Sequence, residues 1–167
     1  VGASYQGHAL SIVGTWLAVG APSDDSEKGA VWLFYWNGTS WNQHGSKLVG
    51  SGAVGTNNPK QGGSVSLDGG HLAVGGAVDN GYKGAVWIFK KTGAGSSAVW
   101  SQFGSKLTGS GIQGSALFGF KVSLSGNYLA VSGHYDNSHT GAVWIFMWSG
   151  TSWGQQGSKL VGTGAVG

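Results

Sequence analysis

Gly29-Ala30-Val31-Trp32 returns twice along this chain, as Gly84-Ala85-Val86-Trp87 and as Gly141-Ala142-Val143-Trp144. Trp87 lies 55 residues after Trp32, and Trp144 lies a further 57 residues on. A fixed period of this size is typical of proteins that stack one supersecondary unit several times. We therefore divide the chain into three repeats with the boundaries 1–55, 56–111 and 112–167.

Two further phrases recur in step with the first. Gly-Ser-Lys-Leu occupies residues 45–48, 104–107 and 157–160, and Leu-Ala-Val occupies residues 17–19, 72–74 and 129–131. In the middle repeat the pattern predicts strands over 62–67, 71–75, 85–90 and 99–107, joined by the tight turn 68–70 and by Gly/Ser-rich or polar loops. Four antiparallel strands in about 55 residues make a unit of the size of a propeller blade.

The third strand of each repeat is apolar on both faces. In the first copy, Val31, Leu33 and Tyr35 point to one face of the strand, and the aromatic residues at 32, 34 and 36 point to the other. A strand with one face in water would alternate apolar and polar residues. The pattern therefore predicts blades that are sandwiched between neighbours, and the fold class is an all-β propeller of three four-stranded blades, open within one chain and completed by further blades.

The third repeat resembles the FG-GAP repeat of integrin-α-type propellers. Phe118-Gly119-Phe120 leads into the strand 121–126, and Gly20-Ala21-Pro22 supplies the second half of the motif in the first repeat. The resemblance implies a β-propeller on the cell surface or outside the cell. Integrin repeats often hold calcium between their first two strands, but the matching turns here (13–15, 68–70 and 125–127) are too short and too poor in oxygen ligands. Calcium dependence is therefore not carried over.

Three blades do not close a propeller, which typically needs four to eight. The phrase at 48–55 returns almost unchanged at 160–167, so that a second copy would continue the repeat in register. We expect a window of a longer array, a head-to-tail ring of two copies, or a fibre. A β-trefoil, with three four-stranded repeats nearer 40 residues that close within one chain, is the alternative fold.

The amino-acid composition argues against several classes of function. The chain has 34 Gly, 9 Trp, no Cys and only 9% charged residues, and all its basic residues are scattered lysines. Nucleic-acid readers use clustered basic residues and arginine forks, so we expect no nucleic-acid partner. No apolar run is long enough to span a bilayer. With one Glu and Asp residues mostly at turns, we expect neither an enzyme nor a cofactor.

Three recurring or exposed positions are candidate sites. Asp24, Asp79 and Asp136 share one repeat position, where they could form a ring of ligand contacts or satisfy a turn backbone. The recurring Lys47, Lys106 and Lys159 could form a basic rim or block pairing at a blade edge. Trp36 and Trp148, whose counterpart in the middle repeat is Lys91, and the adjacent Tyr35 are candidate ligand or partner contacts, or edge packing.

Two weaker candidates remain. Asn37-Gly38-Thr39 is an N-glycosylation sequon placed in a predicted hairpin turn, which alone would explain the Asn-Gly pair. The five histidines share no repeat position, and His134 and His139 lack an evident third ligand, so we expect no metal site.

The sequence therefore predicts an extracellular structural or adhesive protein that assembles head-to-tail with further copies of itself. The alternative is a carbohydrate- or protein-binding, lectin-like propeller module.

Overall fold

The computed structural model describes residues 3–56 and 58–164. It contains three four-stranded antiparallel sheets, each with its strands in sequence order, so that each sheet is one blade. Blade 1 consists of β1 (Ala9–Val13), β2 (Trp16–Ala21), β3 (Ala30–Trp36) and β4 (Trp41–Gln43). Blade 2 consists of β5 (Ser64–Asp68), β6 (His71–Gly76), β7 (Ala85–Thr92) and β8 (Val99–Gln102). Blade 3 consists of β9 (Lys121–Ser125), β10 (Tyr128–Gly133), β11 (Ala142–Trp148) and β12 (Trp153–Gln155).

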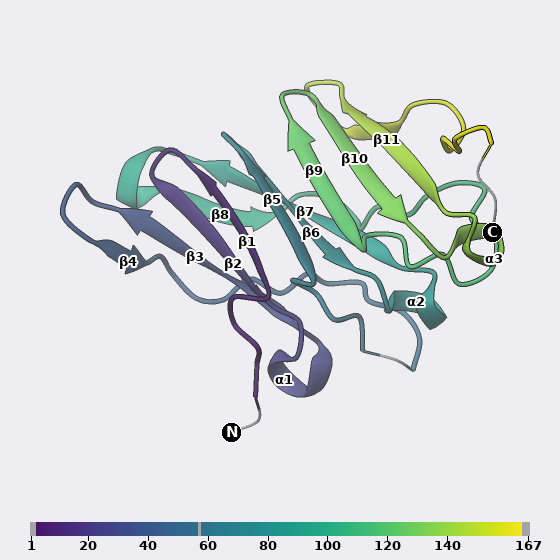
Figure 1. The fold of residues 1–167 in the computed structure, drawn as a ribbon. Coiled ribbons are helices and arrows are strands. Elements are labelled where there is room, and N and C mark those ends of the chain that lie inside the picture. The colour runs from purple at the N-terminus through teal and green to yellow at the C-terminus, as the bar shows by residue number, and fades with distance from the viewer. Residues whose placement is uncertain (1–2, 57, 165–167) are drawn as a thin grey trace.

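The blades stand side by side with blade 2 in the middle (Figure 1). Their first strands lie next to one another, since β5 contacts both β1 and β9. The three separate sheets confirm the predicted all-β blades and exclude the trefoil alternative. The sheets do not close into a ring.

The four predicted strands of the middle repeat are confirmed, with differences at their ends: β5, β6 and β7 each extend one or two residues beyond the predicted end, and two further ends are shorter than predicted. β5 begins at Ser64 rather than at residue 62, because Gly62 has a positive φ of 85° and starts a turn. The predicted strand 99–107 is too long: β8 ends at Gln102, and the chain turns at Gly104 (φ 69°). Leu107 then returns to pair with Val86 of β7, with N···O distances of 3.0 and 2.7 Å.

The loop after the second strand of each blade contains a four-residue helical turn. These are α1 (Asp24–Glu27), α2 (Asp79–Tyr82) and α3 (Asp136–His139); a three-residue 3₁₀ turn, η1 (Gly95–Ser97), precedes β8. Asp25, Asn80 and Asn137 all have φ near 50°. Asp and Asn tolerate this left-handed conformation better than most residues, which explains why they recur here.

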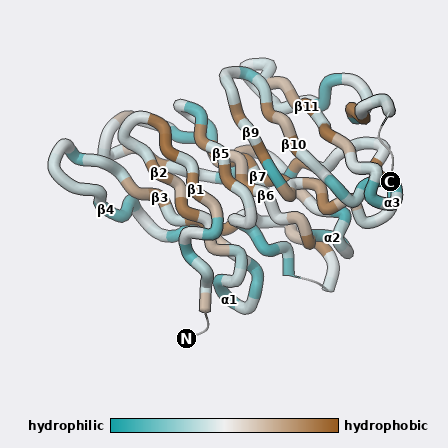
Figure 2. The backbone as a smooth tube through the Cα atoms, in the orientation of Figure 1, coloured by the Kyte–Doolittle hydropathy of each residue, from teal (hydrophilic) through white to brown (hydrophobic). Residues whose placement is uncertain are grey.

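The hydrophobic core lies between blades rather than within one. One cluster joins blades 1 and 2 and includes Val31, Leu33 and Trp87, and a second joins blades 2 and 3 and includes Ile88 and Trp144. The middle third strand is therefore buried on both faces over 85–89, as the sequence predicts. Figure 2 shows hydrophobic residues along β1, the strand of blade 1 that contacts β5 of blade 2. Among the described residues, no helix is long and apolar enough to cross a membrane.

Candidate functional site: the open blade faces

The two junctions inside the chain share a hydrogen bond at the first strands. The backbone N–H of Leu67 in blade 2 donates to Oγ of Ser11 in blade 1 at 2.9 Å, and the N–H of Leu124 donates to Oγ of Ser66 at 2.9 Å. Ser123 has the same position in blade 3 and is exposed. A serine thus recurs wherever a following blade can donate an amide to it.

A second shared feature is the segment that leaves each blade after the fourth strand. We call these segments straps: strap 1 is 48–54, strap 2 is 107–113, and strap 3 is 160–164. Strap 1 crosses onto blade 2, where Nε1 of Trp87 donates to the Ser51 carbonyl at 2.7 Å. Gln102 accepts from the Ser51 N–H at 2.7 Å, and Asp79 Oδ1 accepts from the Val54 N–H at 2.8 Å.

Strap 2 repeats these contacts on blade 3. Nε1 of Trp144 donates to the Ser110 carbonyl at 2.8 Å, and Gln155 Oε1 accepts from the Ser110 N–H at 2.8 Å. Asp136 Oδ1 accepts from the Gln113 N–H at 2.7 Å. Each strap is therefore held by the same three side-chain types: a tryptophan, a glutamine and an aspartate of the following blade.

Each strap also needs a glycine over the tryptophan ring. A Cβ added to Gly50 would lie 2.1 Å from Cδ1 of Trp87, and one added to Gly109 would lie 2.6 Å from Nε1 of Trp144. Gly162 is the counterpart in strap 3, and nothing lies within 4 Å of its added Cβ. Strap 3 thus has the glycine that the contact requires, and the described part of the chain leaves it uncovered.

Blade 1 keeps all three strap-binding side chains, although no described segment covers them. Trp32, Gln43 and Asp24 stand where Trp87, Gln102 and Asp79 stand in blade 2. Trp32 is half-buried, whereas Trp87 and Trp144 are fully buried. Gln43 Nε2 donates to the Gly45 carbonyl at 2.9 Å, the same bond that holds Gln102 and Gln155 in place. Blade 1 therefore has the side chains that bind a strap in blades 2 and 3.

The outer face of blade 1 is apolar and exposed. Leu10 and Ile12 of β1 are 62% and 60% exposed, while their counterparts Val65 and Leu67 are 8% and 5% exposed against blade 1. Burial of apolar surface stabilises by roughly 25 cal/mol per Å², so such a face favours a covering partner.

The outer face of blade 3 is the opposite half of the same junction. Val143 and Ile145 are half-buried, whereas the equivalent Val31 and Leu33 are covered by blade 2. Tyr128 is 55% exposed, while the equivalent Trp16 packs its ring against Trp100 of blade 2. The two ends of the described chain thus present complementary halves of a junction that the chain forms twice internally.

The recurring aspartates and lysines form ion pairs. Lys106 contacts Asp79 and Lys159 contacts Asp136, and in both pairs the carboxylate is buried. The pair of Lys47 with Asp24 in blade 1 is more exposed, because no described segment covers it as a strap. A lysine and a strap amide satisfy each buried carboxylate, which explains the recurrence of both positions by packing.

The candidate aromatic contacts lie close to junctions. Trp148 packs against His71 of blade 2 and Trp153, with ring centroids 4.9 and 5.7 Å apart. Tyr35 packs on Trp16 at 5.0 Å. Trp36 pairs with Trp41 at 5.7 Å, at the open end of blade 1 where no ring from another blade meets them among the described residues. The structure therefore places Trp36 in the open half-junction and Trp148 in a closed one.

Asn37 is exposed in the β3–β4 turn. Its Oδ1 accepts from the backbone N–H groups of Thr39 and Ser40, both at 2.9 Å. The residue thus has a turn role, and its exposure is compatible with the predicted glycan. Within 3–56 and 58–164, no three His, Asp or Glu side chains gather in a way that could hold a metal ion.

Two side chains have shifted pKa values. Burial lowers the pKa of His71, Lys90 lowers it further, and Asp68 opposes the shift. Its ring lies at the junction of blades 2 and 3, with its centroid 4.9 Å from that of Trp148 and its plane tilted by 58°. A hydrogen bond from Lys28 lowers the pKa of the exposed Asp25 carboxyl. Protonation of His71 is therefore coupled to the packing of blades 2 and 3.

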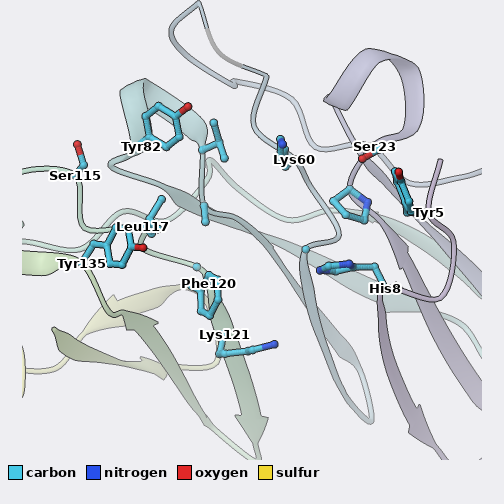
Figure 3. Close-up of a pocket in the computed structure, with 15 residues that line it drawn as sticks. Tyr5, His8, Ser23, Lys60, Tyr82, Ser115, Leu117, Phe120, Lys121 and Tyr135 are labelled. Atoms are coloured by element: carbon cyan, nitrogen blue, oxygen red, sulfur yellow. The ribbon is translucent and has the colours of Figure 1, made fainter. Parts of the chain in front are cut away.

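A cavity of about 760 Å³ opens near the first strands and spans all three blades. Figure 3 shows Tyr5, His8 and Ser23 on one side of it, Tyr82, Leu117, Phe120 and Tyr135 on the other, and Lys60 between. Lys121 extends along its rim. No carboxylate lines this cavity among the described residues. The sequence gives little warning of the cavity, because its aromatic residues do not share a repeat position.

The sequence interpretation also missed the strap-binding glutamines. Gln43, Gln102 and Gln155 recur in step with the tryptophans, and this recurrence was the available signal. Gln61 was likewise missed: it is buried and exchanges two hydrogen bonds with the Gly50 backbone, at 2.6 and 2.8 Å.

Part of the chain is similar to a known protein family. A family model described as the FG-GAP repeat matches residues 100–146, from the fourth strand of blade 2 to the third strand of blade 3. No curated protein matches the chain. The matched residues contain the last strand of blade 2, strap 2 and the first three strands of blade 3, and the same strand order recurs in blades 1 and 2. The chain therefore contains a segment, residues 100–146, that is similar to the FG-GAP repeat, and its three four-stranded blades are those of a β-propeller-type repeat module.

Proposed function

We propose that the chain is a structural or adhesive repeat protein that assembles head-to-tail with further copies of itself, into a ring or a fibre. The observation that carries the proposal is the complete strap-binding set on blade 1, Trp32, Gln43 and Asp24, which lacks a strap in the described chain. Strap 3 of a second copy offers Gly162 and Thr163 where strap 1 offers Gly50 and Ser51. The same copy's blade 3 would cover Leu10 and Ile12.

A neutral, weakly charged junction suits this role. The internal junctions are built mainly from apolar side chains and hydrogen bonds. The buried ion pairs of Asp79 and Asp136 lie within single blades, and the pair of Lys60 with Glu27, which joins blades 2 and 1, is exposed. Continuity with these two junctions argues for a blade of the same kind as the occupant, rather than an unrelated protein. Whether copies close into a ring or continue as a fibre depends on the rotation at the new junction.

Sedimentation velocity over a concentration series tests the proposal. Wild type is expected to form species heavier than 17.0 kDa as concentration rises. Leu10→Lys places a charge in the open face and should shift the protein to monomer. Val99→Lys is the matched control, because Val99 is also 62% exposed but lies at the outer edge of blade 2. A wild-type monomer at every concentration would sink the proposal, and so would equal loss in both variants.

We further propose an extracellular or cell-surface location, supported by the FG-GAP repeat and by the exposed sequon at Asn37. Peptide mass spectrometry of native material should find a glycan on Asn37. Unmodified Asn37 in all secreted material would contradict the glycosylated form. Likeness to the integrin-α type of propeller stays a prediction, as does the absence of enzymatic activity.

The cavity between the blades favours ligand binding as a second candidate function. Its aromatic walls and Lys121 suit a flat ligand that carries an anionic group, such as an acidic sugar, whereas Lys60 is already paired with Glu27 at 3.0 Å. A glycan array that includes uronic and sialic acids tests this, with Tyr135→Ala and Lys121→Gln as variants. Binding that survives both variants, or binding to neutral sugars alone, would rule out this use of the cavity.

A further inference from the structure

Ser132 breaks the repeat at a point of close contact between blades. Its counterparts are Gly20 in blade 1 and Gly75 in blade 2, each next to the last residue of its second strand. A Cβ on Gly20 would lie 2.1 Å from the Gly62 carbonyl oxygen of the next blade, and one on Gly75 would lie 2.0 Å from the Gly119 carbonyl oxygen. Both internal junctions therefore require glycine at this position.

The matching carbonyl in blade 1 is that of Gly7. Gly7 has φ 92°, close to the 85° of Gly62 and the 91° of Gly119. Its N–H donates to the Gly20 carbonyl at 3.1 Å, as the Gly62 N–H donates to the Gly75 carbonyl at 3.1 Å. Gly7 therefore presents its carbonyl to a preceding blade in the same way as its two counterparts.

From these contacts, and resting on the proposed head-to-tail assembly, we infer that Ser132 makes the junction between copies wider and weaker than the junctions inside the chain. A second copy docked with internal geometry would place its Gly7 carbonyl about 2 Å from the Ser132 Cβ, which no real contact allows. The second copy must therefore stand back by about 1 Å at this corner. A gap of this size loses a large part of the dispersion attraction across it.

The rest of the third blade allows this displaced docking. Just before the third strand, Gly29 packs on the Gln61 backbone of the next blade, and Gly84 packs on the Phe118 backbone. Gly141 is also glycine at this position, so the corresponding contact with a second copy is not blocked. Ser123 keeps the acceptor that Ser11 and Ser66 use. The wedge is thus confined to Ser132, and association between copies is reversible while the internal junctions stay closed.

Two substitutions separate the side-chain carbon from the hydroxyl group. Ser132→Gly removes the wedge and should strengthen association by at least about tenfold in Kd. Ser132→Ala keeps Cβ and loses only the hydroxyl, which accepts from the Lys121 N–H at 3.1 Å; its Kd should stay within about twofold of wild type. Ser101→Gly, at an exposed strand serine in blade 2, is the control for added backbone freedom. Circular dichroism confirms that each variant is folded.

Sedimentation equilibrium gives the Kd of each variant. Stronger association of Ser132→Gly than of wild type, with no such gain in Ser132→Ala or Ser101→Gly, supports the inference. If wild type associates and Ser132→Gly does not strengthen it, or Ser132→Ala strengthens it equally, the inference is wrong and the head-to-tail assembly stands. If wild type and Ser132→Gly are both monomeric at all concentrations, the inference fails together with the proposed function.

Discussion

The strap glycines allow one substitution to be compared at three equivalent positions. Gly50, Gly109 and Gly162 lack the positive φ that would strain alanine, so the backbone accepts the change at each. In the first two positions the new Cβ would enter the ring of Trp87 or Trp144, and both rings are fully buried and cannot move aside. At Gly162 the Cβ meets nothing.

The expected magnitudes follow from these contacts. Overpacking costs about 1–3 kcal/mol, and weakening the bond from Trp144 Nε1 to the Ser110 carbonyl costs about 1 kcal/mol more. Gly109→Ala should therefore lower the free energy of unfolding by about 2–4 kcal/mol, which for a chain of this length lowers Tm by on the order of 5–15 °C. Gly162→Ala should be neutral, or stabilising by about 0.4–1 kcal/mol, because alanine restricts the unfolded chain.

Urea unfolding followed by tryptophan fluorescence measures these differences, at a concentration low enough to keep the protein monomeric. Gly50→Ala should resemble Gly109→Ala. A Gly109→Ala variant within about 0.5 kcal/mol of wild type would refute the strap packing. Equal destabilisation by Gly162→Ala in the monomer would show that strap 3 is already covered within the chain.

Three further predictions concern buried polar groups. Asp136→Asn leaves Lys159 without its charge partner and should cost about 3–5 kcal/mol by chemical denaturation, whereas Asp24→Asn, whose ion pair is more exposed, should cost about 1 kcal/mol or less; equal losses would contradict the strap's role. The pKa of His71 is lowered in the folded state, so the unfolded state binds more protons below its ordinary pKa of about 6.5 and stability falls as pH decreases through that value. His71→Tyr should remove this part of the Tm-versus-pH slope, and an unchanged slope would exclude His71 as its source. Gln61→Ala should cost about 2–4 kcal/mol, since it leaves buried Gly50 backbone groups unpaired, while the exposed Gln6→Ala should be neutral in the monomer; thermal unfolding of both variants checks the contrast.

Much of the fold could be predicted from the recurrence of Gly-Ala-Val-Trp, because period and strand pattern depend on local sequence. The end of β8 could not, since the return of Leu107 to Val86 is a contact between strands that the alternation of Val99 to Leu107 does not encode. For the same reason the sequence placed Lys106 at a strand edge, whereas it pairs with Asp79.

The candidate interface could be predicted only in part. Recurrence of the repeat led to the expectation of open blades, and the exposed Leu10 and Ile12 agree with it. The strap contacts could not be predicted from the sequence, because they join residues as far apart in the chain as Gly50 and Trp87. Ser132 is visible in the sequence as a departure from glycine, but its effect on packing follows only from the approaches of 2.1 Å at Gly20 and 2.0 Å at Gly75 in the structure.

Hydrogen–deuterium exchange of β1 at low and high protein concentration tests the central claim most directly. Inside the chain, the amides of Leu67 and Leu124 donate to a serine of the preceding blade, and Ile12 is their counterpart in blade 1. The account predicts that peptides covering 10–13 exchange more slowly at high concentration, as Ser123 of a second copy accepts the Ile12 amide. Exchange of β1 that stays constant across the concentration series would contradict it.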